Sequence, residues 1–461
     1  MHFANCLLPI VYCPFYNNFY FAIQITGLEY LFFAAYLVLF AWLVTKTKFF
    51  NRSNLNNSQL VIIFLLKVLA GIFYGWIGIY YGTHAQMQDT WRFHHDSVQE
   101  YNLLYTDPHE YFVNLFRDPY NGGVMKFFEG KDSYWNDLKG NFFVKILSIF
   151  NIFSFGRYFI NVIFYSFITL FGSIAIYRVM TDVFPGKKIQ VIAATFLIPS
   201  FLYWSSGLHK EGLIFLGFAL VIYPVYFGLK NKKFSIASIL LIILGLSLVL
   251  VLRNFLIVIL VPAVITWILA ARFSKKPLIV FAACYAFFLI LFFTAKFIND
   301  DLNFPQAVVT KQNEFTALHG SSSVPMRKLE PNFESFMVNG PQAITLSIIR
   351  PYPGDVHHIL SLAAATEINF LLLLFIIFLF WRKNGSRSRI FIYFCLFFSF
   401  SVLMAIGYSV NNLGAIVRYR SIVLPFLLVP LFCNIDWDKI FAFLSNIMNK
   451  NNVAEKAKIP A

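Results

Sequence analysis

Long apolar runs separated by short polar segments occupy most of the chain from residue 28 onward. Many of them reach about 18 residues, roughly the length at which an apolar helix can cross a bilayer. They do not alternate apolar and polar residues as the strands of a membrane barrel do, so helices are expected. The pattern predicts an all-α, polytopic membrane helix bundle with eleven spans. These spans are 28–45, 60–81, 158–177, 189–206, 212–229, 235–252, 254–271, 277–297, 366–381, 390–409 and 421–435.

The short segments between these spans alternate in charge. Every second one is basic, and the five basic segments together contain sixteen Lys and Arg residues and one acid, Asp182. The positive-inside rule places these segments in the cytoplasm. The tail, 436–461, falls on the same side, and an odd number of spans puts the N-terminus outside. The basic segments are 46–59, 178–188, 230–234, 272–276 and 382–389.

Composition fits a single membrane domain, 1–461, because 59% of the residues are hydrophobic and only 13% are charged. The net charge of +15 is largely explained by the basic segments, and no basic patch is interleaved with stacking aromatic residues. A nucleic-acid partner is therefore not expected. Cys6 and Cys13 could pair in an oxidising compartment, but the other cysteines are expected to be small buried hydrophobic residues. The first 20 residues lack the basic region of a cleavable signal.

Two long segments, 82–157 and 298–365, fall on the predicted outer face. Connections of this length are usually functional. Within the first segment, the run FFVKILSIFNIFSF at 142–155 is expected to lie in the membrane interface rather than to cross the bilayer.

The stretch FLYWSSGLHKEGLIFLGFAL, residues 201–220, contains three adjacent ionisable residues inside an apolar run. A charge at the bilayer centre costs roughly 2.5–3.5 kcal/mol, so His209, Lys210 and Glu211 are not expected at mid-depth. The break at Ser205-Ser206-Gly207 divides 189–229 into two spans and leaves the triplet at the outer surface. A helix N-terminus beside a lysine suits an anion. Glu211 is expected to orient Lys210 or to favour the helix N-terminus.

Arginines also mark the outer ends of other spans. Arg253 stands between two apolar spans, Arg350 ends the run AITLSIIR, and Arg418 and Arg420 precede the last span. Each of them could extend to lipid headgroups, as arginines near helix ends commonly do. As a set, however, they occur where the positive-inside rule predicts few arginines. Together with Lys210 they would suit a lipid phosphate or pyrophosphate.

The first long segment offers a carboxylate for chemistry. In HAQMQDTWRFHHDSVQEY, the residues Asp89, Arg92 and Asp96 recur at spacings of three and four, so they share a helix face, with His95 beside it. Asp89 follows the predicted end of a span, Tyr81, by eight residues. Either aspartate could act as a general base on a sugar hydroxyl. The alternative is an interfacial helix with a solvated charged face.

A divalent metal site is also possible in the outer segments, although the spacing of its potential ligands matches no metal signature. No residue is therefore assigned as a metal ligand, and no cofactor is expected to be required. The potential ligands are His94, His95, Asp96, His357 and His358.

Four features together resemble bacterial surface-polysaccharide membrane proteins, which are similar to the GT-C glycosyltransferases and the O-antigen polymerases. They are an acidic residue in the first outer segment, WSSGLHKEG, RPYPGDVHH and NNLGAIVRYRSIVLPF. The resemblance covers most of the chain in architecture and rests on short motifs. It implies a transferase or polymerase at the outer face of the bacterial cytoplasmic membrane. Its substrates would be a polyprenyl-phosphate- or pyrophosphate-linked sugar and a glycan acceptor.

The resemblance also implies roles for individual residues. Asp89 or Asp96 would be the base, and outer basic residues would bind the lipid phosphate, with further polar residues beside them. No DxD or ExD pair stands in the first outer segment, so the resemblance does not extend to a metal-dependent mechanism. The implied binding residues are Arg92, His95, His209, Lys210, Glu211, Arg253, Arg350, Arg418 and Arg420.

Two other functional classes remain open. A transporter or flippase for lipid-linked glycan would bury ionisable groups near the bilayer midplane. Lys67 in LVIIFLLKVLAG is the one such residue in the predicted spans, and it is expected to extend to the inner surface. An assembly scaffold would have no convergent site.

The alternation of basic and non-basic segments predicts sidedness. A cysteine replacing Lys232 in a cysteine-free background should stay unlabelled by a membrane-impermeant thiol reagent applied from outside. A cysteine placed in 82–157 serves as the control and should be labelled. Labelling at position 232 in intact cells would contradict the predicted topology.

Overall fold

The computed structural model describes residues 27–81, 89–120, 122–127, 133–273, 275–318, 320, 322–383, 386, 388–442 and 445. Within these ranges every regular element is a helix, and β pairing is limited to two isolated bridges, Ser323 with Asn412 and Arg382 with Ile435. The predicted all-helical class is thereby confirmed. Cys6 and Cys13, whose pairing was considered, lie outside the described residues.

Among the described residues, eight helices are long and apolar enough to cross a membrane, which supports a multi-pass membrane protein. Each coincides with a predicted span. The helix that begins at Pro277 is extended by a short 3₁₀ turn, η3 (Ala295–Phe297). The eight are α2 (Gly27–Lys46), α4 (Asn57–Tyr80), α9 (Tyr158–Val183), α12 (Lys210–Asn231), α14 (Phe255–Phe273), α15 (Pro277–Thr294), α18 (Ile359–Phe380) and α19 (Arg389–Ser409).

The other three predicted spans are helical but interrupted or short. The run 189–206 forms α10 (Lys188–Phe196) and α11 (Pro199–Ser206), bent by 53°. The last predicted span, 421–435, forms only α21 (Leu424–Asn434), which is bent by 66° from the preceding helix, α20 (Leu413–Ser421). A proline in the first turn of α11 and of α21 accounts for both breaks, because proline cannot continue the hydrogen bonding of a preceding helix. α13 (Ile236–Leu252) has only 17 residues. Counting each bent pair as one span gives at most ten spans in the described part of the chain, so the eleventh stays a prediction.

Both long segments fold into helices rather than open loops. Short 3₁₀ helices connect the larger helices of these segments: η1 (Asn114–Phe116), η2 (Gly123–Met125), η4 (Asp300–Leu302) and η6 (Pro353–Asp355). Outside them, the short helix α3 (Lys48–Asn51) connects α2 to α4. The second long segment includes a π-helix, η5 (Thr345–Ile349). The larger helices are α6 (Asp89–Thr106), α7 (Pro108–Val113), α8 (Tyr134–Ser154), α16 (Phe304–Ala317) and α17 (Phe333–Ile344).

The run 142–155, predicted to lie in the membrane interface, belongs to α8, which packs on α6 and α9. Lys145 of α8 forms an ion pair with Glu100 of α6, and the Asn151 amide donates to the Ser97 hydroxyl at 3.0 Å. The interfacial position itself remains a prediction. The packing gives α8 a fixed place beside α6.

The centre of the bundle is formed by α9, α12 and α13, whose backbones approach closely. A Cβ at Gly172 of α9 would come within 2.8 Å of the Leu216 Cα atom in α12. On its other side, α12 meets α13 at Gly245, where a Cβ would lie 2.7 Å from the Gly217 carbonyl oxygen. Small residues at such crossings allow the close van der Waals packing that stabilises helix pairs in lipid.

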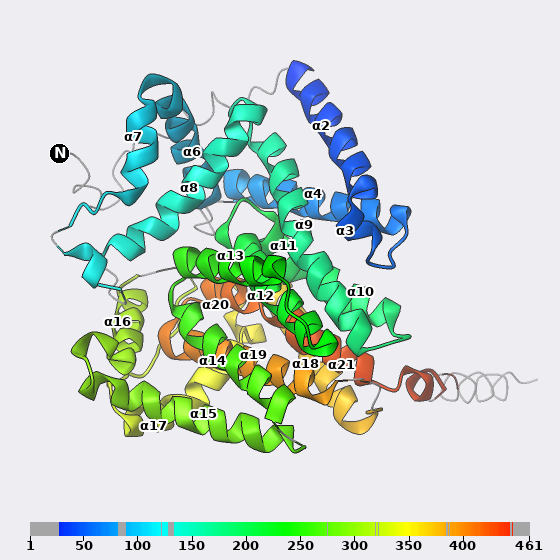
Figure 1. Cartoon of the computed structure of the whole chain (residues 1–461), viewed down its shortest axis with the longest axis vertical. Coiled ribbons are helices and arrows are strands. Elements are labelled where there is room, and N and C mark those ends of the chain that lie inside the picture. Colours follow the sequence, from blue (N-terminus) through cyan, green and yellow to red (C-terminus); the bar gives the residue numbers. More distant parts are fainter. Residues whose placement is uncertain are drawn as a thin grey trace, which may run out of the picture.

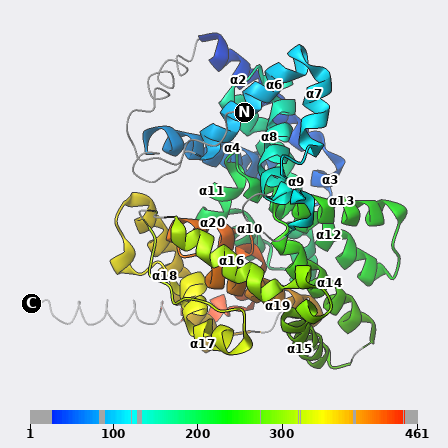
Figure 2. The same ribbon diagram turned by 90° about the vertical axis from the view of Figure 1, so that its left-hand side faces the viewer.

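The two ends of the bundle differ in character. Three basic segments meet at one end, where Arg178 stacks on the ring of Phe49 at 4.9 Å and Lys230 pairs with Asp182 at 2.6 Å. In Figure 1 the helices α7, α8, α16 and α17 of the two long segments lie toward the left, whereas α3 and α10 lie toward the right. Figure 2, which views that left side, shows α8 and α16 in front. The long segments therefore share a side, away from these basic segments.

The close contact of α4 with the chain break before α12 yields a prediction about stability. A Cβ at Gly71 would lie 2.5 Å from Val162 Cγ1 and 2.6 Å from the Ser206 carbonyl oxygen. Gly71→Ala should therefore lower the free energy of unfolding by about 1–3 kcal/mol. Gly140→Ala is the matched control, because Gly140 lies within α8 and a Cβ there meets no atom within 4 Å. Thermal unfolding in detergent compares them, and equal midpoints would contradict the packing described.

Candidate functional site

The candidate site is built around the start of α12, where the chain turns out of α11. His209 has extended backbone and caps α12, and Tyr165 of α9 donates a hydrogen bond to the His209 carbonyl. The Thr90 hydroxyl of α6 donates to the Leu208 carbonyl at 3.2 Å. Gly207 packs so closely on the ring of Tyr74 that a side chain there would overlap it. Three helices thus fix the position of His209, Lys210 and Glu211.

Lys67 of α4 supports the same turn from within the bundle. Its side chain is 2% exposed, and its Nζ atom donates to the Ser205 carbonyl at 3.1 Å and lies 3.3 Å from the Ser205 and Ser206 hydroxyl oxygens. The expectation that Lys67 extends to the inner surface is therefore wrong. The carbonyls at the end of α11 attract this cation because they form the negative end of the helix dipole.

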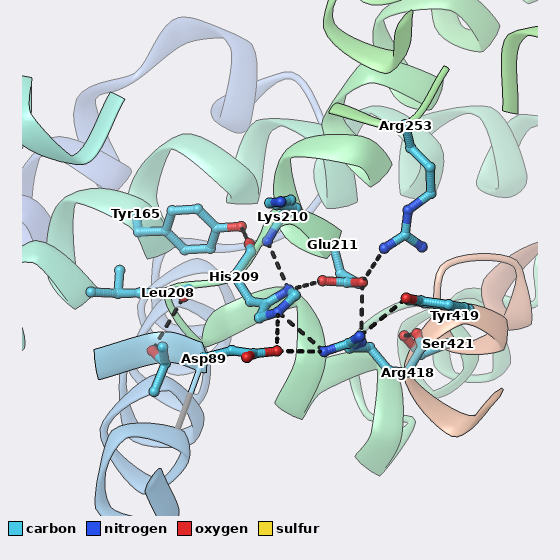
Figure 3. Close-up of polar contacts among 11 residues, drawn as sticks. Asp89, Tyr165, Leu208, His209, Lys210, Glu211, Arg253, Arg418, Tyr419 and Ser421 are labelled. Atoms are coloured by element: carbon cyan, nitrogen blue, oxygen red, sulfur yellow. Dashed lines mark hydrogen bonds and ion pairs between the residues drawn. The ribbon is translucent and has the colours of Figure 1, made fainter. Parts of the chain in front are cut away.

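Glu211 lies at the centre of the charged residues, and its side chain is fully buried. Its Oε1 atom accepts a hydrogen bond from Arg253 Nη2 at 2.8 Å and lies 3.7 Å from Arg418 Nε. The other carboxylate oxygen contacts His209 Nδ1. Figure 3 shows Arg253 and Arg418 converging on Glu211 from different segments. Its main role in the structure is thus to hold two arginines and a histidine, a larger role than orienting Lys210.

Asp89, at the start of α6, lies beside the same charged residues (Figure 3). Its Oδ2 atom lies 3.3 Å from Arg418 Nη1 and 3.8 Å from His209 Nε2 (Figure 3). Burial by itself would raise the pKa of the Asp89 carboxyl, but the hydrogen bond with His209 and the charge of Arg418 hold that pKa well below its usual range. The side chain keeps 55% of its surface exposed. Asp89 is therefore an ionised carboxylate that a solute can reach.

Lys210 differs from its neighbours in having no acidic partner. Its side chain is 9% exposed, and its Nζ atom lies 4.9 Å from the centre of the Phe93 ring. Among the described residues, that Nζ atom makes no hydrogen bond or ion pair. Arg253 and Arg418 both stack on the Tyr419 ring, at 4.0 and 4.9 Å. Aromatic faces therefore position the cations without neutralising their charge.

Several residues predicted for the site lie in other groups. Arg92 and Asp96 pair with each other at 3.9 Å with side chains 81% and 41% exposed, and His95 contacts Gln99 at 3.0 Å. Burial raises the pKa of Asp96. In the described part of the chain, these α6 side chains form no hydrogen bond or ion pair with His209, Lys210 or Glu211.

Arg350 and Arg420 form a second group beside the π-helix η5. Arg420 is 1% exposed and its Nη1 atom donates to the Arg350 carbonyl at 2.6 Å. The Arg350 Nε atom lies 3.5 Å from the Asp355 carboxylate. These two arginines are thus held by backbone carbonyls and by a separate acid. The predicted set of phosphate ligands divides into two groups, and only Lys210, Arg253 and Arg418 share the environment of Asp89.

The histidines considered as metal ligands have structural contacts. His94 is 9% exposed beside the rings of Trp91 and Tyr158, and burial lowers its pKa to about 4. His358 caps α18 by accepting a hydrogen bond from the Ser361 N–H at 3.2 Å. Within the described ranges, no three His, Cys, Asp or Glu side chains gather in a group that could hold a metal ion.

Two lysines near the site were not singled out from the sequence. Lys139 lies on α8 and Lys311 on α16, one in each long segment. Burial, together with the positive charges of Lys311 and Arg253, lowers the pKa of Lys139 to about 8. Lys139 also lies within electrostatic range of Lys210. Nothing in the local sequence separates Lys139 from an ordinary lysine on an amphipathic helix, so only the packing of α8 identifies it.

The burial of Glu211 yields a prediction about stability. Glu211→Gln would leave Arg253 and Arg418 without their shared buried carboxylate, so the free energy of unfolding should fall by about 3–5 kcal/mol. Lys210→Gln is the matched control, because the Lys210 ammonium has no acidic partner to lose. Thermal unfolding of both purified variants in detergent measures the difference. Equal unfolding midpoints would show that Glu211 does not hold the two arginines.

Comparison of the chain with protein-family models, with curated proteins and with solved structures finds no match. Its function must therefore be inferred from the arrangement of its own residues. That arrangement is an accessible, ionised carboxylate beside buried cations, at the start of a helix that is long and apolar enough to cross a membrane.

Proposed function

We propose that the protein is a membrane glycosyltransferase or polymerase that uses polyprenyl-phosphate- or pyrophosphate-linked sugars. It would act at the outer face of the bacterial cytoplasmic membrane, in the synthesis of a surface polysaccharide. The proposal rests mainly on one observation: Asp89 lies next to Arg418 and His209, and Arg418 in turn shares Glu211 with Arg253. A base and an anion site are therefore adjacent.

The proposed reaction divides its work between these groups. When the donor phosphate engages Arg418, the Asp89 carboxylate is freed from the positive charge that holds its pKa low. It then accepts the proton of an acceptor hydroxyl, whose oxygen attacks the anomeric carbon of the donor sugar. A new glycosidic C–O bond forms as the bond from the anomeric carbon to the phosphate oxygen breaks. The leaving lipid phosphate takes the bonding electrons and gains negative charge. Lys210, Arg253 and Arg418 stabilise that charge, since cations fixed in a partly desolvated site are effective where charge develops.

The place of the site in the bundle supports a lipid-linked donor. Lys210 begins α12, a helix long and apolar enough to cross the membrane, so a phosphate bound there would lie at headgroup level. The prenyl chain of the donor could then extend along the membrane while its sugar reaches Asp89 on α6. The helices α6 and α8 of the first long segment would supply the surface that receives the acceptor.

A transporter or flippase for lipid-linked glycan is the second candidate function. Its supporting observation is Lys67, because an ionisable residue inside a membrane span usually serves function. Lys67 is engaged with the Ser205 carbonyl and with two serine hydroxyl groups, an arrangement that also suits a structural role.

The two aspartates provide the sharpest test of the catalytic proposal. In a strain lacking the native gene, Asp89→Asn should lower glycan synthesis by about 10²–10⁴-fold, because the base would lose its charge. Asp96→Asn is the matched control on the same helix and should retain near-normal synthesis. Activity is normalised to the amount of inserted protein. Normal synthesis by Asp89→Asn would refute the assignment of Asp89 as base.

Lipid-linked intermediates from the deletion strain would separate the reaction types. Accumulation of single repeat units on the outer face indicates a polymerase, whereas a glycan that lacks one branch sugar indicates a transferase. Accumulation confined to the inner face would instead indicate a flippase and would contradict the proposal.

A further inference from the structure

The second long segment contains a cavity that lies outside the candidate functional site. Its volume is about 400 Å³, within the range of pockets that hold small ligands. Val338, Pro341 and Leu346 supply an apolar part of its lining, and Arg327 and Arg350 supply two positive charges. No acidic residue is among the described residues that line it. Two cations from separate stretches of the chain therefore border one cavity.

Arg327 lies in an irregular stretch, 324–330, that two glutamine side chains hold in place. The Gln342 side-chain oxygen accepts a hydrogen bond from the Arg327 N–H at 3.2 Å. The buried Gln312 amide donates to the Arg327 carbonyl at 3.2 Å and to the Tyr408 carbonyl at 3.1 Å. In the described part of the chain, the Arg327 guanidinium forms no hydrogen bond or ion pair. Its backbone is thus fixed while its charge stays unmatched.

Arg350 enters the same cavity from the end of the π-helix η5. Its N–H donates to the Thr345 carbonyl at 3.0 Å, and π-helical turns often occur at functional sites. The Arg350 Nε atom lies 3.5 Å from the Asp355 carboxylate but makes no hydrogen bond, because that carboxylate accepts one from the Tyr352 N–H at 2.8 Å. The Nη atoms of Arg350 have no hydrogen-bond partner among the described residues. Its planar set of donors therefore remains available to a ligand.

The exposed face of α17 is apolar and borders this cavity. Phe333, Met337 and Val338 are exposed on α17, whereas Phe336 and Ala343 are buried on the helix, which packs against α19. An exposed apolar face on a helix of a membrane protein is typical of a surface that contacts lipid. Val338 belongs both to this face and to the lining of the cavity. The two arginines are therefore placed beside a surface suited to lipid chains.

We propose that Arg327 and Arg350 together bind the phosphate of a membrane lipid whose chains lie along the exposed face of α17. Guanidinium groups bind phosphate oxygens through paired donors in one plane. The two guanidinium groups and the Asp355 carboxylate sum to one positive charge, which a phosphate diester neutralises. The inference does not rest on the proposed reaction, because Asp89, Lys210 and their partners do not line this cavity.

Lipid binding by the full-length protein tests the inference. The protein is purified in neutral detergent, and its affinity for phosphatidylglycerol is measured by native mass spectrometry over a series of lipid concentrations. Arg327→Gln and Arg350→Gln should each weaken binding by about 10–100-fold, because each removes a charge-assisted contact. Lys328→Gln is the matched control, since Lys328 is exposed beside Arg327 and does not line the cavity. An equal loss in Lys328→Gln and Arg327→Gln, or no loss in either arginine variant, would overturn the inference.

A second variant tests the cavity without removing a charge. Val338→Trp should fill the cavity from an exposed position and weaken phosphatidylglycerol binding at least about tenfold, because the phosphate could no longer reach the arginines. Met337→Trp is the control, because Met337 is exposed on the same helix and does not line the cavity. Thermal unfolding without added lipid checks that both variants are folded. Unchanged affinity in folded Val338→Trp would show that the lipid does not occupy this cavity.

Competition identifies the source of the phosphate. Displacement of phosphatidylglycerol by farnesyl phosphate, dependent on both arginines, would support the inference and assign the site to a prenyl lipid. Failure of farnesyl phosphate to compete would support it and assign the site to a bilayer phospholipid. Inorganic phosphate that competes as well as either lipid would overturn the assignment to a lipid. None of these measurements depends on Asp89, so the lipid site and the proposed reaction can fail separately.

Discussion

The arrangement of the site depends on one buried carboxylate. Glu211 has no exposed surface, and it holds Arg253 and Arg418 while contacting His209. An ionised group in such surroundings is tolerated only when it is paired and hydrogen-bonded. Because its partners come from the turn before α14 and from α20, Glu211 joins segments far apart in the sequence. The positions of the accessible Asp89 carboxylate and of the buried Lys210 ammonium follow from those of its partners.

Close backbone contacts enclose the charged residues at the start of α12. Gly207 lies against the ring of Tyr74, and Gly71 admits the Ser206 carbonyl beside α4. The turn between α11 and α12 is therefore enclosed by protein instead of lipid. Irregular backbone within a membrane protein is tolerated where it is buried in protein or lines a polar cavity. The same enclosure orients the first residue of α12, Lys210, toward Phe93 of α6.

Much of this architecture could be predicted from hydrophobic runs alone, because long apolar segments have few alternatives to helix in a bilayer. The bends at Pro199 and Pro425 could not be predicted in this way, because the length of an apolar run does not show how a proline redirects the chain. They determine whether each bent pair of helices counts as one membrane span. The sequence also identified the residues at the start of α12. The sequence could not show that Arg253 pairs with Glu211 whereas Arg350 lies beside Asp355. Both arginines lie at the ends of apolar runs, and only the packing of the helices determines their neighbours. For the same reason, the prediction for Lys67 was wrong and Lys139 was not recognised as a residue near the site.

The contact of Lys67 with Ser205 has a consequence for biogenesis. Residue 67 enters the membrane well before residue 205 has been synthesised, so α4 first meets lipid with an ammonium group near its middle and no partner for it. Holding such a charge at the bilayer centre costs roughly 2.5–3.5 kcal/mol on the insertion scale. The most apolar 18-residue window of α4 has a mean hydropathy of 2.3, which favours insertion despite this charge, but the Lys67 ammonium finds its hydrogen-bond partner only when α11 is in place. The N-terminal helices therefore settle into place only after the middle of the chain has joined them.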